Sequence, residues 1–509
     1  MFRNVISRRR SSGVSATAPP PTASGPAQRA PGDVQVPSQR SKPVVEVRSI
    51  DYVPPTERRG RVWHQGPFWF TGNFVLATMV AGFIGPSLGL AVGWSVLAAT
   101  LGASFGTLFM CFHANQGPTM GLPQMIQSRA QWGTRGAIFP FIAVVFVYIG
   151  FNVFDVILAA EGLDTLLPAP NAVWYPILIA VAVVIAVVGY DLMMVVQRWL
   201  TYLLIVVFGV LTVQAVLSLD MGAAVAHGGS FSPAAFLIQF AAAAGYQISY
   251  AVYVSDYSRY LPESTRARGV IWWTYLGAAG SAVWLMSLGA VLGSSLPSPD
   301  AITTVRHVGN SLFSGFGTFT VVVSAVALVT IMSVNAYGAM LTSASGIDAF
   351  RPLKPTVRLR VIGIVIISAI AFVVALSIPA NYLGSFNNFV TLMLYFLVPW
   401  TAVNLVDFYF VRRGHYAILE IFNPRGIYHR WAWRGLVAYF GGLAAMVPFV
   451  ALTFFEGPVT KALGGADISW AIGLSVAGAL YYGFSRSLDV SGEADAIARS
   501  RALLVEKTP

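Results

Sequence analysis

The sequence predicts an all-α integral membrane protein, and three observations support this fold class: the composition, the lengths of the apolar segments and the positions of the positive charges. Of the 509 residues, 56% are hydrophobic and only 10% are charged. A soluble domain carries about 25% charged residues. The composition therefore excludes a set of soluble domains, and the single cysteine, Cys111, excludes a disulfide scaffold.

Apolar segments of about 18–25 residues are long enough to cross a bilayer as helices. The sequence contains twelve of them, at 66–89, 91–112, 136–160, 172–190, 194–218, 232–254, 270–296, 315–345, 359–378, 382–410, 435–455 and 468–485. An even number of spans places both termini on the same side of the membrane.

The positive charges indicate which side that is. All 32 Lys and Arg residues except Arg306 and Lys461 fall in the two terminal tails or in alternate connections between the spans. By the positive-inside rule, both termini are predicted to be cytoplasmic. We expect the protein to lie in the plasma membrane. The net charge of +11 then reflects topology, so we expect no nucleic-acid partner.

The composition also divides the chain. Residues 1–60 are rich in Pro, Ser, Ala, Gly and Arg and are predicted to form a disordered basic cytoplasmic tail. A helical core is expected over 61–410, in two halves at 61–219 and 230–410. Helices 11 and 12 are expected within 411–485, followed by a second cytoplasmic tail at 486–509.

Two of the predicted helices carry a glycine beside an amide near mid-depth. Helix 1 contains Gly72 and Asn73, and helix 6 contains Gly245 and Gln247. These helices begin two groups of five, and matched interruptions are typical of an inverted-repeat transporter with its site at the bilayer midplane. For either glycine alone, close packing between helices is the alternative interpretation.

Polar side chains within helices 3 and 8 mark candidate site residues: Tyr148, Asn152, Asp155, Thr330, Ser333 and Asn335. No Lys or Arg is expected at depth in a span. Rings and amides without a fixed cation suit a neutral, flat solute that forms hydrogen bonds. Asp155 is a candidate proton or cation site, or a solvated residue near the end of helix 3.

Motifs for other activities are missing from the sequence. It contains no Walker loop, no Gly-x-Ser-x-Gly motif and no metal-spaced His/Cys cluster. We therefore expect secondary transport driven by an ion gradient, without a cofactor, rather than an enzyme. A channel or receptor remains the alternative class. The expected partners are the lipid bilayer and a small solute, with no obligatory protein partner evident.

Several motifs resemble those of the nucleobase–cation symporter-1 family, in its purine–cytosine permease branch. They are Ile50 to Arg58 (IDYVPPTER), Gly121 to Ala130 (GLPQMIQSRA), Asp256 to Pro262 (DYSRYLP), Asp407 to Arg413 (DFYFVRR), and GIY and WRG at 426–428 and 433–435. The resemblance covers about 50–485. It implies a five-plus-five inverted repeat with two additional C-terminal helices, and cation-coupled import of cytosine or a purine. Allantoin, a hydantoin or a pyridine vitamin is the alternative solute.

The resemblance also implies a substrate site between helices 1, 3, 6 and 8. Gly72 and Asn73 lie at the interruption of helix 1. Helix 3 would present the ring of Tyr148 and the amide of Asn152. The remaining positions implied are a second stacking position at Tyr246 or Gln247, the helix 8 amide of Asn335 and an outer gate near Phe386.

The coupling ion stays open. The family's sodium site would use carbonyls at Thr71, Phe74 and near Thr330, together with two consecutive hydroxyls. Here Ser333 is followed by Val334, which supplies no oxygen ligand. Sodium coupling is therefore weakened, and a proton, carried for example by Asp155, becomes a competing prediction.

Overall fold

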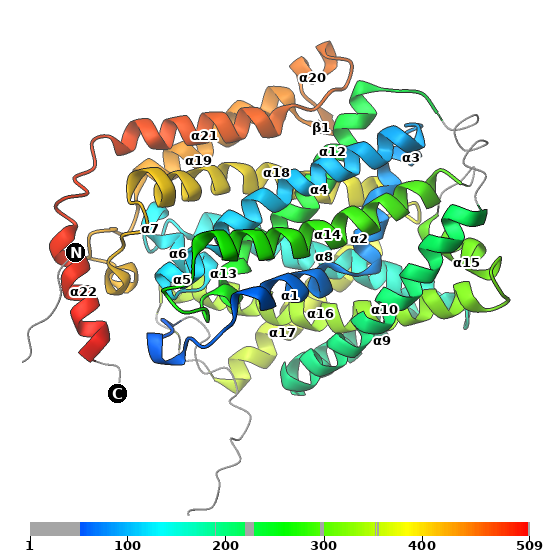
Figure 1. The fold of residues 1–509 in the computed structure, drawn as a ribbon, viewed down its shortest axis with the longest axis horizontal. Coiled ribbons are helices and arrows are strands. Elements are labelled where there is room, and N and C mark those ends of the chain that lie inside the picture. The colour runs from blue at the N-terminus through cyan, green and yellow to red at the C-terminus, as the bar shows by residue number, and fades with distance from the viewer. Residues whose placement is uncertain are drawn as a thin grey trace, which may run out of the picture. The chain divides into compact units, whose positions relative to one another are not determined.

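The computed structural model describes residues 51–188, 190–218, 229–295, 300–351, 353 and 356–506. The predicted tail at 1–60 lies mostly outside the described residues. The described chain is mainly helical, and its long helices run side by side (Figure 1).

The first group of spans begins with a broken helix 1 and continues through four long helices. Helix 1 comprises η2 (Val62–His64), α1 (Gln65–Asn73), α2 (Leu76–Val80), η3 (Ala81–Phe83) and α3 (Ile84–Ser87). The others are α4 (Val92–Ala114), α8 (Ile138–Asp164), α9 (Asn171–Val188) and α10 (Tyr190–Ser218).

The second group repeats this order. Helix 6 comprises α12 (Pro233–Ile248), η4 (Ser249–Val252) and α13 (Val254–Ser258), and it is followed by α14 (Ala267–Gly293), α16 (Phe316–Asp348), α17 (Val357–Ser377) and α18 (Leu383–Val406). A π-helical turn, η5 (Asp407–Val411), extends α18. The C-terminal helices are α19 (Trp433–Met446), α21 (Ser469–Ser485) and α22 (Ala494–Glu506).

Short elements connect these helices. They are η1 (Pro55–Glu57), α5 (Gln116–Met120), α6 (Gln124–Gln127), α7 (Arg129–Trp132), α15 (Ala301–Asn310), η6 (Ile418–Phe422), η7 (Val447–Phe449), the strands β1 (Ala451–Leu452) and β2 (Phe455–Glu456), and α20 (Pro458–Ala462).

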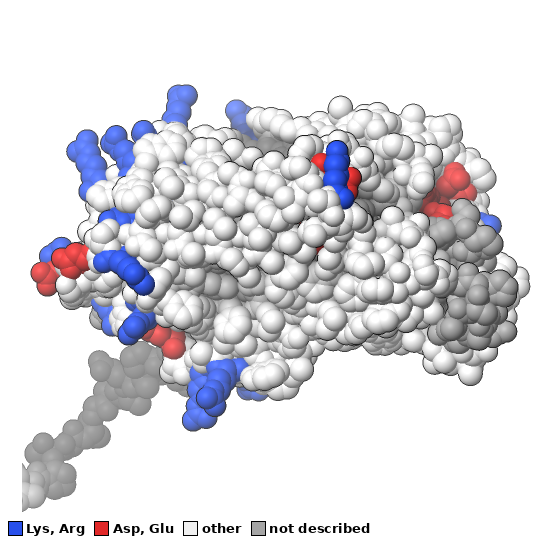
Figure 2. All heavy atoms as spheres, turned by 90° about the horizontal axis from the view of Figure 1, so that it is seen from above, with Lys and Arg blue, Asp and Glu red and all other residues white. Residues whose placement is uncertain are grey.

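The surface of the described chain is that of a multi-pass membrane protein. Eight helices are long and apolar enough to cross a membrane, and the bent pair in helix 1 makes a ninth. The count of twelve spans is consistent with this fold and stays a prediction. Figure 2 shows Lys and Arg gathered mainly at one end, beside a broad uncharged surface. Apolar side chains such as Val206 and Val373 are exposed on the long helices, where lipid would cover them.

Helix 1 is broken, as predicted. Its two parts, Val62–Asn73 and Leu76–Ser87, meet at 72°. Val75 has the extended conformation, with φ −139° and ψ 161°. The break therefore follows Gly72 by a few residues.

In helix 6 the break lies elsewhere than the sequence predicted. The helix α12 continues through Gly245 and Gln247, and regular α-helix stops short of Tyr253, which has φ −138° and ψ 6°. A Cβ atom at Gly245 would lie 2.0 Å from the carbonyl oxygen of Val390 in α18. The predicted interruption at Gly245 is therefore wrong, because this glycine lets two helices pack closely.

The predicted helix 11, 435–455, also ends early. The helix α19 stops at Met446, and β1 and β2 pair in antiparallel fashion between Ala451 and Glu456. Pro448 lies between helix and hairpin, and it lacks the N–H that an α-helix needs there.

Candidate functional site

A cavity of about 490 Å³ lies beside the breaks in helices 1 and 6. Its wall comes from helix 1, α8, α10, helix 6 and α16. Most of the wall is aromatic: Trp63, Phe68, Trp69, Tyr148, Phe151, Tyr202, Tyr246, Tyr250, Tyr253 and Tyr257. Its polar residues include Thr71, Asp155, Gln197, Arg198, Thr201 and Asn335. The combination of ring faces with a few polar groups is typical of a site for a small flat molecule.

The cavity reaches the surface at one end, and its lining includes the buried residues Asp155 and Tyr246. The lining residues Trp63, His64 and Arg198 are exposed, and they come from the start of helix 1 and the third turn of α10. Phe386 of α18, the predicted outer gate, lies outside the lining and is fully buried, with its ring 5.1 Å from that of Phe154 in α8. The cavity is therefore accessible from the end at which helix 1 begins.

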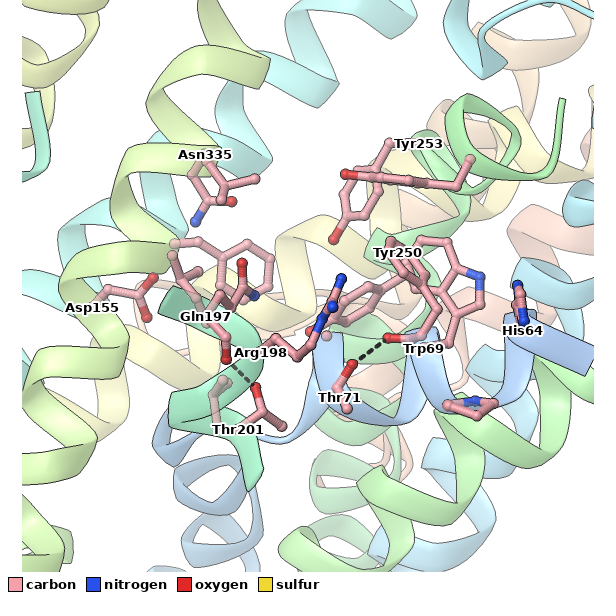
Figure 3. A pocket seen from close by; sticks show the side chains of 18 of the residues that line it. His64, Trp69, Thr71, Asp155, Gln197, Arg198, Thr201, Tyr250, Tyr253 and Asn335 are labelled. Carbon is pink, nitrogen blue, oxygen red and sulfur yellow. Dashed lines mark hydrogen bonds between the residues drawn. The ribbon is translucent and has the colours of Figure 1, made fainter. Parts of the chain in front are cut away.

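The structure brings part of the predicted site together around this cavity. Six predicted residues line it: Thr71, Gly72, Tyr148, Asp155, Tyr246 and Asn335. The others lie outside its lining: Asn73, Phe74, Asn152, Gln247, Thr330, Ser333 and Phe386. Figure 3 shows Asp155 and Asn335 on one side of the cavity and Trp69, Tyr250 and Tyr253 on the other.

Helix 6 presents Tyr246, not Gln247, to the cavity. The Tyr246 hydroxyl accepts a hydrogen bond from Thr78 Oγ1 at 2.9 Å. Gln247 faces α4, where its Oε1 atom accepts from Thr107 Oγ1 at 3.3 Å. Of the two stacking positions that the resemblance implies, Tyr246 is therefore the one in contact with the cavity.

Two predicted amides bind neighbouring helices. Asn73 Nδ2 donates to the Ala278 carbonyl of α14 at 3.0 Å. Asn152 Nδ2 donates to the Met332 carbonyl of α16 at 3.2 Å. The Oδ1 atom of Asn152 is buried and has no hydrogen-bond partner among the described residues. The substrate contacts predicted for these amides stay predictions.

Asp155 is only 2% exposed, and its Oδ2 atom has no hydrogen-bond partner in the described part of the chain. An unpaired buried polar atom costs about 1–3 kcal/mol. A carboxylate kept in this state inside a membrane helix, beside a cavity, is a candidate functional group. Its position does not match that of a solvated residue at a helix end.

Arg198 corrects the expectation of a site without a fixed cation. It is not a loop residue: it lies in the third turn of α10, is exposed and lines the cavity (Figure 3). Gln197, Thr201 and Tyr202 line the same wall. Their positions, 197, 198, 201 and 202, fall on one helical face, and this spacing was the available sequence signal.

A second periodic pattern was also missed. Tyr246, Tyr250, Tyr253 and Tyr257 line the cavity at successive turns of helix 6. Spacings of three and four residues place side chains on one side of a helix, even where the helix changes type at η4. Gly245 and Gln247 predicted the break about two turns before Tyr253, where the backbone leaves α-helical geometry.

The predicted sodium ligands are engaged with one another. Ser333 Oγ donates to the Thr330 carbonyl at 2.6 Å, and the Thr71 carbonyl accepts from the Phe74 N–H at 3.2 Å. Val334 lines the cavity without offering an oxygen. These contacts leave the sodium site as a prediction with a weak ligand set.

Comparisons with known proteins agree with this geometry. The family model described as a permease for cytosine/purines, uracil, thiamine and allantoin matches residues 52–473. The chain belongs to this permease family. The permease is 38% identical over 442 residues to the putative purine-cytosine permease YxlA of Bacillus subtilis, covering 86% of this chain and 95% of that protein. It is 25% identical over 466 residues to the purine-cytosine permease FCY2 of Saccharomyces cerevisiae, covering 86% and 85%.

Solved structures show the fold of the permease. An inward-facing conformation of Mhp1 matches with a TM-score of 0.71 at 17% identity, covering 88% of this chain and 97% of that one. A closed conformation of Mhp1, described as a nucleobase-cation-symport-1 family transporter with bromovinylhydantoin bound, matches with a TM-score of 0.69, covering 90% and 99%. The predicted all-α, inverted-repeat membrane fold is confirmed.

Proposed function

We propose that this permease imports a nucleobase, cytosine or a purine, by cation-coupled alternating access. The observation that carries the proposal is the largely aromatic cavity beside the breaks in helices 1 and 6, which reaches the surface where helix 1 begins. Unwound backbone within a membrane is tolerated where it lines such a cavity. A family of permeases for cytosine, purines and related heterocycles adds support.

The chemistry of the wall fits a flat base. Ring faces from helix 6 and α8 offer stacking surfaces, and the amide of Asn335 offers both a donor and an acceptor to the edge of a heterocycle. Leaving a buried polar group unpaired costs about 1–3 kcal/mol, so a solute without a matching edge would bind more weakly.

For the coupling ion we propose a proton, carried by Asp155. Its unpaired Oδ2 atom lies at the cavity that the substrate would occupy, which supports joint binding of the two. The replacement of a ligand hydroxyl by Val334 argues against sodium.

We further propose that the open end of the cavity faces the cytoplasm and that both termini are cytoplasmic, in the plasma membrane. The gathering of Lys and Arg at one end supports this orientation (Figure 2). The structure then corresponds to a state that releases substrate inward.

Uptake into proteoliposomes tests the proposal. Labelled cytosine, hypoxanthine, uracil and allantoin are supplied in turn, under a proton gradient or a sodium gradient alone. We expect accumulation of cytosine or hypoxanthine under the proton gradient. Accumulation of allantoin alone would contradict the nucleobase assignment and make allantoin the substrate. A channel would equilibrate every accepted solute without concentrating any.

A further inference from the structure

The positive charge of Arg198 has no partner among the described residues. Arg198 lies in α10, is exposed and lines the cavity. Its guanidinium forms no hydrogen bond or ion pair with another residue of the described chain. In Figure 3 it lies between Asp155 and Asn335 on one side of the cavity and Trp69 and Tyr250 on the other. The N–H donors of its guanidinium are therefore available to a ligand in the cavity.

The rotation of α10 turns Arg198 toward the cavity rather than toward lipid. Gln197, Thr201 and Tyr202 line the same cavity. Trp199 is 69% exposed and lies outside the lining, as expected for a side chain that faces lipid. One residue corresponds to about 100° of rotation around a helix, so neighbours in sequence face different surroundings. Arg198 therefore belongs to the cavity face of α10.

The other polar groups of the wall are weaker donors. Thr201 Oγ1 already donates its hydrogen to the Gln197 carbonyl at 2.8 Å. The amide of Asn335 is neutral and offers an acceptor as well as a donor. Hydrogen bonds from a charged donor are about twice as strong as those between neutral groups. Arg198 is therefore the group of the lining with the strongest demand for acceptor atoms on the ligand.

We propose that Arg198 selects the substrate by binding an edge with two neighbouring acceptor atoms. A 6-oxopurine such as hypoxanthine or guanine offers N7 and O6, and cytosine offers N3 and O2. This inference rests on the proposed function and deepens it, because it divides the nucleobases into those that the permease prefers and those that it binds weakly.

The shape of the guanidinium supports this selection. Its planar fork places two N–H groups side by side, which matches two acceptors on one edge. Arginine pairs with N7 and O6 of guanine in this way in the major groove of DNA, whereas adenine presents N7 beside an amino donor. Uracil has an N–H group on at least one side of each carbonyl and no two neighbouring acceptors. Adenine and uracil therefore offer the fork a single acceptor.

Substitution of Arg198 tests the inference in two matched pairs of bases. In proteoliposomes, uptake of labelled hypoxanthine is measured with adenine as competitor, and uptake of labelled cytosine with uracil as competitor. Arg198→Gln should raise KM for hypoxanthine and cytosine by roughly 5- to 100-fold, the range known for a bidentate arginine contact. The inhibition constants of adenine and uracil should stay within about twofold. Arg198→Lys should not restore KM, because a lysine carries the charge without the fork.

Arg268→Gln is the control. Arg268 is exposed in the first turn of α14 and lies outside the lining of the cavity. Its substitution removes the same charge and should leave every KM and inhibition constant within about twofold. An effect as large as that of Arg198→Gln would assign the result to the loss of positive charge and overturn the inference.

Four further outcomes would overturn the inference and leave the proposed function standing. They are an unchanged KM in Arg198→Gln, an equal weakening of both members of each pair, a full recovery in Arg198→Lys, and a parent protein that binds adenine and uracil as tightly as hypoxanthine and cytosine. Failure of the parent protein to take up any base would instead overturn the proposed function, and the inference with it.

Discussion

Two buried carboxylates behave differently in this permease. Asp407, where α18 passes into η5, is 0% exposed and accepts four hydrogen bonds. The donors are Arg412 at 2.6 Å, Gln131 and Tyr416 at 2.7 Å each, and Tyr481 at 2.8 Å. Asp155, 2% exposed, has an Oδ2 atom with no partner in the described chain and lies beside the cavity. Both are equally removed from solvent.

The difference indicates that pairing, rather than burial, distinguishes an acid that stabilises the fold from a candidate functional one. Asp407 is the centre of a network that also includes Glu493, which binds Arg412 at 2.9 Å. Burial lowers the pKa of Arg412, but the charges of Asp407 and Glu493 outweigh this effect and raise it well above its ordinary value. This network connects η5 to α7, to α21 and to the segment before α22. Asp155 has no comparable hydrogen bonds to neighbouring helices in the described chain, which is why we propose it as the proton carrier.

The largest effect is expected at Asp407. Asp407→Ala leaves the buried guanidinium of Arg412 with a single anionic partner and removes an acceptor from three further donors. Breaking a buried charge pair typically costs about 3–5 kcal/mol. We expect a strong loss of folded protein, measured by size-exclusion chromatography after heating in detergent. The control is Asp489→Ala, at an exposed turn. If the Asp407→Ala protein is stable and active, Asp407 does not have the structural role described above.

Asp155→Asn should have little effect on stability and a large effect on transport. Its thermal stability should stay within about 1 kcal/mol of the parent protein, because no paired contact is lost. Under an imposed gradient of one pH unit, the parent can concentrate a base by up to about tenfold. The variant should not concentrate the base inside the proteoliposomes, but it should still exchange labelled for unlabelled base. Intact concentrative uptake in this variant would contradict proton carriage by Asp155.

Two glycines extend the comparison to the cavity wall. A Cβ atom at Gly72 or at Gly209 would meet no atom within 4 Å, but only Gly72 lines the central cavity. Gly72→Val should raise KM for a purine by about tenfold, because the added side chain would occupy space that the bound substrate needs. Overfilling a site costs about 1–3 kcal/mol. The matched control, Gly209→Val, should leave KM unchanged. Equal effects of both substitutions would place the substrate elsewhere.

The smallest effect is expected at Glu493. Glu493→Gln weakens the hydrogen bonds to Arg412, but Arg412 still has Asp407 as an anionic partner. Hydrogen bonds to charged groups contribute about 1.5–3 kcal/mol. The helix α22 should then exchange its amide hydrogens faster, as measured by mass spectrometry, while KM stays within about twofold. A large change in transport would show that α22 takes part in the cycle.

These comparisons also show what the sequence could and could not predict. Hydropathy located the long helices, because a lipid-facing helix needs a continuous apolar surface. The break at helix 1 followed from Gly72 and Asn73. The break near Tyr253 could not be found in this way, since Gly245 has the same composition signal but serves helix packing against Val390.

The site was predicted in part for the same reason. Tyr148, Asp155 and Asn335 line the cavity, and each was visible as a polar or aromatic residue within a span. Whether an amide faces a cavity or a neighbouring helix depends on the rotation of its helix. That is why Gln247 and Asn152 bond to other helices. Arg198 was assigned to a loop because charge, in the sequence alone, indicates a connection.

The most direct test of proton-coupled nucleobase import is the current produced when base is added to proteoliposomes on a solid-supported membrane. A neutral base carried with a proton moves positive charge. With sodium absent from both sides, we predict a saturable current that grows as the outer pH falls and that is lost in Asp155→Asn. A current that requires sodium, or that persists unchanged in Asp155→Asn, would contradict the account.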